Sequence, residues 1–273
     1  LSQSMTSYFI LSKTFIILLC LFHTIDSQSQ PWSPLDAPKE LLQMLIRDPF
    51  TLSLASTDFG HIIHKTPFAV FAPSSIQDIS KLIKFSNSLP IPFTIAALGR
   101  GHSVNGQSMT NDGVVVNMTE LNNNNNNNNN RIVVYDDYVD VGGEQIWIDV
   151  LHASLEKGLT PLSWTDYLYL SVGGTLSNAG ISGQTFRYGP QISNVHELDV
   201  VTGKGDLVTC STKKNSKLFY AALGGLGQFG IITRARIALG PAPQRVKWLH
   251  LLYNNFSTFS EDQEHLISLD GIN

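Results

Sequence analysis

Residues 96 to 108 read Ala-Ala-Leu-Gly-Arg-Gly-His-Ser-Val-Asn-Gly-Gln-Ser, and this stretch decides the fold. Gly99 and Gly101 allow backbone N–H groups to approach an anionic group closely, and Arg100 adds a positive charge. His102 has only small neighbours, so its imidazole is accessible for chemistry. Taken alone, the stretch is consistent both with a cofactor-binding loop and with a glycine-rich turn that contains an ordinary histidine.

Two later stretches extend this pattern. Residues 163 to 183 contain Ser-Trp-Thr-Asp-Tyr-Leu and then Gly-Gly-Thr-Leu-Ser-Asn-Ala-Gly-Ile-Ser-Gly, and residues 224 to 236 read Gly-Gly-Leu-Gly-Gln-Phe-Gly-Ile-Ile-Thr-Arg-Ala-Arg. With the first stretch, they resemble the cytokinin dehydrogenases of plants, which are flavoproteins of the vanillyl-alcohol-oxidase type. The resemblance runs from about residue 38 to about residue 268. It implies an α+β fold, a two-lobed FAD-binding domain of the PCMH type with only the start of the substrate domain present.

The domain organisation expected from this resemblance has four parts. Residues 1–29 form a signal peptide, 30–67 an N-terminal arm with a short helix, and 68–242 both lobes of the FAD-binding domain without its C-terminal completion. Residues 243–273 form the truncated start of a cytokinin-binding substrate domain. Chains of this family are roughly twice as long, so the chain as given would have unpaired sheet edges and missing core contacts. Because their free-energy cost exceeds a typical free energy of folding, we expect the chain as given to be neither a stable nor an active enzyme.

Composition indicates a globular protein without a polyanionic partner. The chain has 273 residues, 42% of them hydrophobic and 15% charged, with a net charge of -4 and a pI near 6.0. The basic residues are dispersed, which argues against nucleic-acid binding. We also expect no metal, because His61, His64 and His152 lack ligand spacing or acidic neighbours.

The N-terminal region predicts export. Residues 15–22 are apolar, follow Lys13, and are too short for a membrane span, which is typical of the central part of a secretory signal. An uncleaved anchor or a buried helix is the alternative. Met5 is the natural start after residues 1–4, and we expect a secreted, apoplastic or vacuolar protein without stable membrane insertion. Cys210 alone would remain in the mature chain, without an internal disulfide, and Asn117 and Asn255 have the form of glycosylation acceptors.

Hydrophobic periodicity and turn residues predict the elements. The expected helices cover residues 39–47, 76–88 with Ser74 or Ser75 as N-cap, 144–157, and 217–223. The expected strands or β-rich segments are 68–72, 92–97, 113–117, 131–141, 194–202, 207–210 and 231–239, and the element 244–253 resembles the start of the substrate domain. The nine asparagines 122–130 are interpreted as an expanded hairpin loop without function.

Residues 225–230 fit the G-x-G-x-x-G pattern of nicotinamide dinucleotide sites, but their context excludes one. That pattern follows a strand and opens a helix, whereas here a helical segment precedes it and the β-branched residues 231–233 follow. We assign these glycines to a loop that packs against the adenine or pyrophosphate part of a flavin, as the resemblance implies.

The resemblance implies covalent FAD, attached through the imidazole of His102. Such a bond should raise the flavin potential and ease hydride acceptance. Ser171 replaces a threonine that is frequent in relatives and keeps the hydroxyl. By resemblance, the residues that line FAD are Ala97, Gly99, Arg100, Gly101, His102, Ser103, Gln107, Asp166, Ser171, Ser177, Ile181, and Ile231 or Ile232.

Asp166 is the expected catalytic residue. A carboxylate among aromatic side chains can serve as a base toward a substrate amine, although an Asp that caps a helix is the structural alternative. Trp164, Tyr167 and Tyr169 are interpreted as packing residues. By resemblance, the reaction is oxidative cleavage of N6-isoprenoid adenines such as isopentenyladenine and zeatin to adenine and an aldehyde, with oxygen or a quinone as electron acceptor and a monomer as the active form.

Two rival functions remain open from the sequence. A sister FAD-linked oxidase of alcohols or sugars would share the His102 loop but not the segment from Trp164 to Tyr167. The other rival is an inactive, truncated flavin-binding product.

Overall fold

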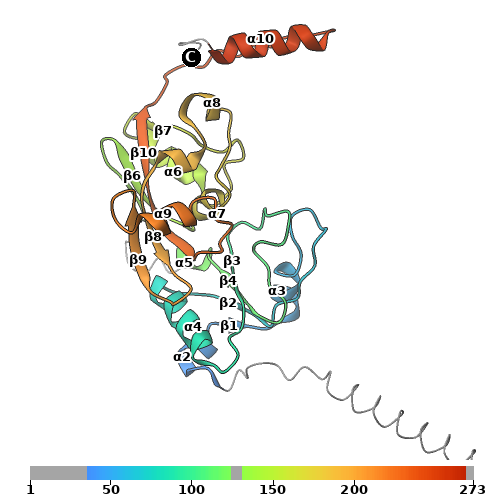
Figure 1. Ribbon diagram of the computed structural model, residues 1–273, viewed down its shortest axis with the longest axis vertical. Helices are drawn as coiled ribbons and strands as arrows, with labels where there is room; N and C mark the ends of the chain where they lie inside the picture. Colours follow the sequence, from blue (N-terminus) through green and yellow to red (C-terminus); the bar gives the residue numbers. More distant parts are fainter. Residues whose placement is uncertain (1–35, 124–130, 269–273) are drawn as a thin grey trace, which may run out of the picture.

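The computed structural model describes residues 36–123 and 131–268, which form two β-sheets with helices around them (Figure 1). The smaller sheet has the order β1-β2-β4-β3. β1 (Leu45–Ile46) is antiparallel to β2 (Ala69–Phe71), whereas β2 and β3 (Ile95–Leu98) both run parallel to β4 (Val114–Asn117). This sheet is buried on both faces at β4, as expected for a parallel sheet covered by other elements.

The larger sheet is antiparallel, with the order β5-β6-β10-β8-β9. It consists of β5 (Ile132–Val134), β6 (Tyr138–Gly142), β8 (Val195–Val201), β9 (Leu207–Ser211) and the long β10 (Ile231–Pro241), and β7 (Leu159–Pro161) pairs with the end of β10. The predicted α+β architecture with two lobes is confirmed.

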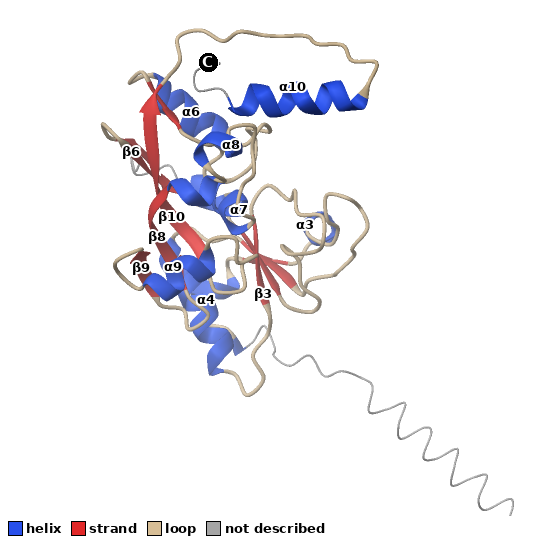
Figure 2. Ribbon diagram, turned by 45° about the horizontal axis from the view of Figure 1, so that its top comes forward, coloured by secondary structure: helices blue, strands red, loops and turns tan. Residues whose placement is uncertain are grey.

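Helices accompany the two sheets. They are α2 (Lys39–Leu42), α3 (Pro49–Leu54), α4 (Ile76–Ser88), α5 (Glu120–Asn123), α6 (Trp147–Leu155), α7 (Val172–Ser177), α8 (Thr185–Tyr188), α9 (Ser216–Ala222) and α10 (Phe256–Ser268), with a 3₁₀ helix at Gln191–Asn194. Some of them, such as α4 and α7, pack against a sheet core. In both ribbon views α7 lies between β10 and β3 (Figure 2). Val172 and Leu176 of α7 are fully buried in the core of the larger sheet.

The two lobes share packing. The core of the smaller lobe contains Ile79 and Leu82 of α4, and it also includes Val201 of β8 and the partly buried Ile231 of β10. Burial of apolar surface is the main stabilising contribution to such a contact. The two lobes therefore lie side by side, and β3 and the beginning of β10 face the same space between them.

The predicted helix 76–88 is confirmed: Ser75 caps α4, and its Oγ accepts a hydrogen bond from the Asp78 N–H. The predicted helix 39–47 is wrong in its second half. The helix ends at Leu42, and Leu45 and Ile46 pair with Phe71 and Val70, because sheet pairing outweighs local propensity.

Helix α3 was not predicted from the sequence, although its signal is present. Pro49 occupies the first turn, and the Asp48 carboxylate accepts hydrogen bonds from the N–H groups of Phe50 and Thr51. Proline is favoured at this position because it has no N–H to leave unsatisfied. Pro49 therefore lies at the start of a helix.

Three other expectations require correction. The predicted helix 144–157 begins only at Trp147, since the Gly143 and Gln145 carbonyls accept hydrogen bonds from Gly173 N and Val172 N instead of continuing a helix. The asparagine run does not connect a hairpin, because β4 and β5 lie in different sheets; Asn124 to Asn130 themselves lie outside the described residues. Residues 244–253 form neither a helix nor a strand, and the helix of this region is α10.

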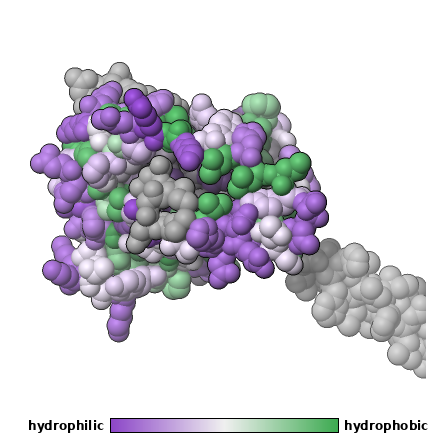
Figure 3. Space-filling model, turned by 90° about the horizontal axis from the view of Figure 1, so that it is seen from above, coloured by the Kyte–Doolittle hydropathy of each residue, from purple (hydrophilic) through white to green (hydrophobic). Residues whose placement is uncertain are grey.

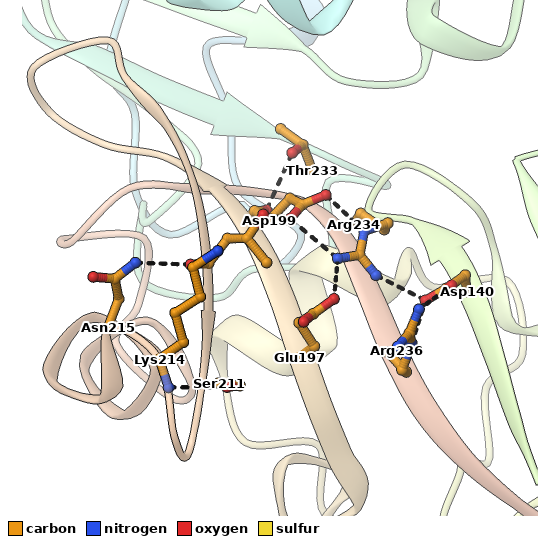
Figure 4. A network of polar contacts seen from close by, with 10 residues as sticks. Asp140, Glu197, Asp199, Ser211, Lys214, Asn215, Thr233, Arg234 and Arg236 are labelled. Carbon is orange, nitrogen blue, oxygen red and sulfur yellow. Dashed lines mark hydrogen bonds and ion pairs between the residues drawn. The ribbon is translucent and has the colours of Figure 1, made fainter.

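One face of the larger sheet carries an ion-pair network (Figure 4). Arg234 of β10 contacts three carboxylates, Asp140, Glu197 and Asp199, at 2.7, 2.6 and 2.6 Å. Arg236 makes a second contact to Asp140 at 2.7 Å. The network ties β6, β10 and β8 together on the side of the sheet opposite the apolar core.

The segment after β10 leaves the sheet and ends in α10, which buries no residue. Val246, Trp248, Leu252 and Phe256 in this region are strongly exposed. Viewed from above, hydrophobic residues reach the surface at several separate places among hydrophilic ones (Figure 3). Among the described residues, none of the helices has the length and apolar character needed to cross a membrane. The predicted signal peptide, 1–29, lies outside the described residues.

Candidate functional site

A cleft of about 1150 Å³ lies where the two lobes meet. Three chain segments supply most of its wall: residues 94–111 after and within β3, residues 170–181 around α7, and residues 226–232 before and within β10. Ligand pockets for drug-sized molecules are typically about 300–1,000 Å³, so this cleft suits a large, extended ligand. The three glycine-rich stretches of the sequence therefore converge on one site.

The glycines allow these segments to approach one another closely. A Cβ atom on Gly99 would lie 2.2 Å from Ser171 Oγ, so the first loop touches the start of α7. A Cβ atom on Gly143 would lie 2.2 Å from the Ile232 carbonyl oxygen, and Gly173 N donates to the Gly143 carbonyl at 2.8 Å. Any larger side chain at these positions would push the walls of the cleft apart.

The loop after β3 presents backbone donors. Gly101 has a φ of 71°, a left-handed conformation that glycine adopts without strain. Within the described part of the chain, the backbone N–H groups of residues 100–103 make no hydrogen bond to a protein acceptor. Successive free N–H groups around a left-handed residue form a concave site for an anion.

The charged side chains of the cleft are positive, and they add to the partial positive charge of the free N–H groups. Lys65 and Arg100 line it, and neither forms an ion pair among the residues that the structure describes. No carboxylate belongs to the described lining. Because unlike charges attract strongly where water is partly excluded, the cleft favours an anionic ligand such as a pyrophosphate.

His102 is half-buried beside this loop. Its Nδ1 lies 2.9 Å from the Arg100 carbonyl oxygen, which accepts the hydrogen bond from the ring. The imidazole also stacks on the Phe59 ring, with centroids 4.5 Å apart, and contacts the Tyr167 ring at 5.1 Å. The position and orientation of the imidazole are thus set by contacts from three parts of the chain.

The structure brings almost all of the predicted cofactor residues to the cleft. Those that line it are Ala97, Gly99, Arg100, Gly101, His102, Ser103, Gln107, Ser171, Ser177, Ile181, Ile231 and Ile232. Asp166 is the exception: it is exposed and does not belong to the lining, whereas Thr165 does. Its two neighbours in the sequence lie at the site, since Thr165 lines the cleft and Tyr167 contacts the His102 ring, so Asp166 belongs to a segment at the rim. Its catalytic role stays a prediction.

The context of the residue 225–230 glycines also agrees with the sequence analysis. Helix α9 ends at Ala222 and β10 begins at Ile231, so the loop joins a helix to a strand, the reverse of a nicotinamide dinucleotide site. Leu226 has a positive φ of 53°, and its N–H donates to the Ser177 carbonyl at 2.9 Å. A strained backbone of this kind is typical of ligand-binding loops.

Cys210 is excluded as a nucleophile of this site. Its side chain is buried in the core of the larger sheet, and burial, with the nearby Asp199 and Glu197 carboxylates, raises the pKa of the thiol to about 11. The thiol is therefore protonated and unreactive at neutral pH.

Among the residues that the sequence did not reveal are Lys65, which lines the cleft, and Phe59, which contacts His102. Both come from the arm before β2, which carries no glycine motif. A lone lysine and a lone phenylalanine have no spacing that would mark them, so the fold alone reveals their position.

These features fit FAD. The cleft is large and extended, its glycine-rich walls leave room for a ligand against the backbone, and free N–H groups with Lys65 and Arg100 suit the pyrophosphate. An imidazole stands at the edge of the same loop, where it could reach the ring system of a flavin.

Comparison with known proteins identifies the kind of domain. A family model described as FAD binding domain matches residues 67–211, or 145 of the 273 residues. A second family model, described as cytokinin dehydrogenase 1, FAD and cytokinin binding, matches residues 243–273.

Curated relatives carry a consistent name. The chain is 57% identical over 231 residues to cytokinin dehydrogenase 10 of Oryza sativa subsp. japonica, covering 84% of this chain and 42% of that protein. It is 54% identical over 242 residues to cytokinin dehydrogenase 4 of Arabidopsis thaliana, covering 85% and 46%. It is 52% identical over 267 residues to cytokinin dehydrogenase 3 of the same plant, covering 96% and 50%. The chain thus spans half or less of the length of these relatives.

A solved structure supports the fold. The crystal structure of 6-hydroxy-D-nicotine oxidase from Arthrobacter nicotinovorans superimposes with a TM-score of 0.60 at 22% identity, covering 71% of this chain and 41% of that chain. The predicted resemblance to cytokinin dehydrogenases is confirmed by the relatives, and the two-lobed PCMH-type fold by this likeness. With more than half of its length matched by that family's model, the chain belongs to the FAD binding domain family.

Proposed function

We propose that the protein is an FAD-dependent oxidoreductase that cleaves the N6-isoprenoid side chain of cytokinins, such as isopentenyladenine and zeatin, to adenine and an unsaturated aldehyde. One observation carries this proposal: the His102 loop and the segment from Thr165 to Tyr167 meet at one cleft. The curated relatives, all named cytokinin dehydrogenases, support the substrate class.

Different residues would bind the cofactor and transfer the proton. The free N–H groups of residues 100–103, with Lys65 and Arg100, would hold the pyrophosphate, while Gly99 and Ser171 keep the cleft wall close to the ligand. Bound FAD supplies the acceptor for a hydride from the carbon next to the substrate nitrogen. Asp166 takes or orients the proton of the side-chain amine, and water then hydrolyses the resulting imine.

Asp166 has the exposure that this role requires. Its carboxylate makes no hydrogen bond or ion pair in the described part of the chain, so it is available to a substrate amine at the rim. A helix-capping role, the structural alternative, finds no support, since no helix N–H of the described residues bonds to it.

The activity test uses the protein expressed in full from its native transcript. Purified enzyme with isopentenyladenine should form adenine and aldehyde in equal amounts. Asp166→Asn should lower kcat at least about tenfold with unchanged flavin content, because a positioned general base contributes on the order of 10² to 10⁴ in rate. Asp136→Asn, which changes an exposed turn residue away from the cleft, is the matched control.

Two results would overturn the proposal. Turnover of alcohols or sugars without turnover of isopentenyladenine would indicate the sister-oxidase alternative. Flavin-loaded protein that turns over none of these substrates would indicate a non-catalytic flavin-binding protein.

We further propose that FAD is bonded covalently to His102. The support is the position of the imidazole at the edge of the anion-binding loop, held by the Arg100 carbonyl. After acid precipitation, the yellow colour should stay in the pellet of the wild-type protein. For His102→Ala, the flavin should be released into the supernatant and the pellet should be colourless. A colourless wild-type pellet from flavin-loaded enzyme would refute the covalent bond.

We also propose that the protein is exported to the apoplast or the vacuole, acts as a monomer, and passes electrons to oxygen or a quinone. The apolar segment 15–22 supports export. Of the two glycosylation triplets, Asn255 is the exposed one, whereas Asn117 is half-buried and donates to Glu120 at 3.1 Å. Enzymatic deglycosylation should shift the mass of the wild-type protein but not of Asn255→Gln. An unshifted wild type would contradict glycosylation.

A further inference from the structure

The imidazole of His102 contacts two aromatic rings that come from distant parts of the chain. Phe59 stacks on it with an interplanar angle of 22°, and Tyr167 meets it at 41°. Among the described ring contacts, each of these rings contacts the imidazole, and neither contacts the other. We call Phe59 and Tyr167 the aromatic clamp.

Phe59 is held in place by the backbone and not by burial. Its side chain is 57% exposed, yet its N–H donates to the Ser103 carbonyl at 3.0 Å, which ties it to the loop that carries His102. The preceding residue, Asp58, is 2% exposed, and its Oδ1 accepts hydrogen bonds from Ile62 N and Ile63 N at 2.9 and 3.2 Å. These bonds fix the turn from which Phe59 projects.

An exposed phenylalanine held against an imidazole contributes little to folding, since most of its apolar surface remains in water. Phe59 matters more for the orientation of the His102 ring than for folding. The hydrogen bond from Nδ1 to the Arg100 carbonyl fixes one edge of the imidazole ring. Stacking on Phe59 hinders rotation of the ring about its Cβ–Cγ bond. The electron-rich faces of the clamp also stabilise positive charge on an imidazole, which develops when a ring nitrogen is alkylated.

We propose that Phe59, together with Tyr167, is a positioning residue for the attachment of flavin to His102. This inference rests on the covalent bond proposed above. In the attachment, an imidazole nitrogen forms a bond to the methyl carbon at position 8 of the flavin ring. One C–H and one N–H bond are lost, two protons leave, and two electrons pass into the flavin ring and then to dioxygen. The clamp accelerates this step by holding the nitrogen toward the methyl group.

The test follows attachment in time. Apoprotein, expressed in full length in a riboflavin-starved host, is mixed with FAD in air, and samples are precipitated with acid and scored for bound flavin. Phe59→Leu should attach flavin at least about tenfold more slowly than wild type, since small misplacements of reacting groups reduce rates strongly. Phe59→Tyr should restore the wild-type rate, because it keeps the stacked ring. The affinity for FAD before attachment, measured by fluorescence quenching, should be unchanged in both variants.

Phe50→Leu is the matched control, since Phe50 lies in α3 of the same arm, is 72% exposed and makes no ring contact among the described residues. Phe59→Leu that attaches flavin at the wild-type rate would overturn the inference while leaving the covalent bond intact. Loss of FAD affinity or of folding in Phe59→Leu, without rescue by Phe59→Tyr, would show a structural role instead. Wild-type protein without covalent flavin would refute the proposed bond itself, and the inference with it.

Discussion

Single residues determine the width of the cleft. Gly99 faces the Ser171 hydroxyl so closely that a methyl group there would lie 2.2 Å from the oxygen. Gly101 has a different role, because its positive φ turns the loop, whereas a Cβ there would meet only Leu98 Cδ1, at 3.8 Å. Both glycines were singled out from the sequence, but only the structure separates close packing at one from backbone conformation at the other.

Gly99→Ala should weaken FAD binding by at least about fivefold, because overpacking of this kind costs about 1–3 kcal/mol and moves the cofactor loop away from α7. The dissociation constant of the apoprotein, measured by flavin fluorescence, checks this. Gly203→Ala is the control, since nothing lies within 4 Å of the added methyl. Equal affinity of Gly99→Ala and wild type would contradict the proposed contact of FAD with this wall.

Strands β6, β10 and β8 hold the larger lobe together through the Arg234 network as well as through their apolar face. Burial tends to raise the pKa of the Asp199 carboxyl, but hydrogen bonds from Arg234 and Thr209 outweigh this effect, and the pKa lies below its usual 3.8. Stabilisation from Asp199 is therefore fully present above about pH 4 and is lost as the pH falls through the lowered pKa of the folded state.

Asp199→Asn should consequently reduce the free energy of unfolding at pH 7 and flatten its decline below pH 4. Urea unfolding followed by circular dichroism at several pH values measures both effects. Asp136→Asn, at an exposed turn, should keep the wild-type profile. A profile of Asp199→Asn that parallels wild type down to pH 3 would show that the Arg234 contact stabilises little.

The connection from β5 to α6 depends on a buried pair. The Glu144 side chain is fully buried and accepts two hydrogen bonds from Arg131, at 2.7 and 2.9 Å. Glu144→Gln should destabilise the protein by about 3 kcal/mol, because it leaves the Arg131 charge partly buried without its partner. Thermal and urea unfolding measure the loss, with the exposed Glu156→Gln as control. A change below about 0.5 kcal/mol would contradict this assignment.

The sequence predicted most elements correctly because their apolar periodicity agrees with their tertiary packing, as in α4 and β10. It failed where long-range contacts decide. Leu45 and Ile46 continue a helical pattern in the sequence but pair with β2. Glu144 was predicted to begin a helix, but its side chain forms an ion pair with Arg131. The start of α3 has a local signal, Pro49 after the capping Asp48, although the helix was not predicted.

In the whole molecule, the site arises because two lobes bring together loops separated by more than a hundred residues. The motifs around Gly99, Ser171 and Ile231 were predictable, since glycine-rich loops after strands and helices mark ligand sites, and all three line the cleft. Lys65 and Phe59 were not predictable, because their role depends on how the arm folds back over the His102 loop. The rim position of Asp166 likewise required the structure.

A mass measurement on tryptic peptides of the flavin-loaded protein tests the covalent bond between FAD and His102. Cleavage after Arg100 and Arg131 releases residues 101–131, which include His102. This peptide should carry the mass and the visible absorbance of FAD, with fragment ions that place the flavin on His102. A flavin-free peptide 101–131 from yellow protein, or flavin on another peptide, would contradict attachment of FAD to His102.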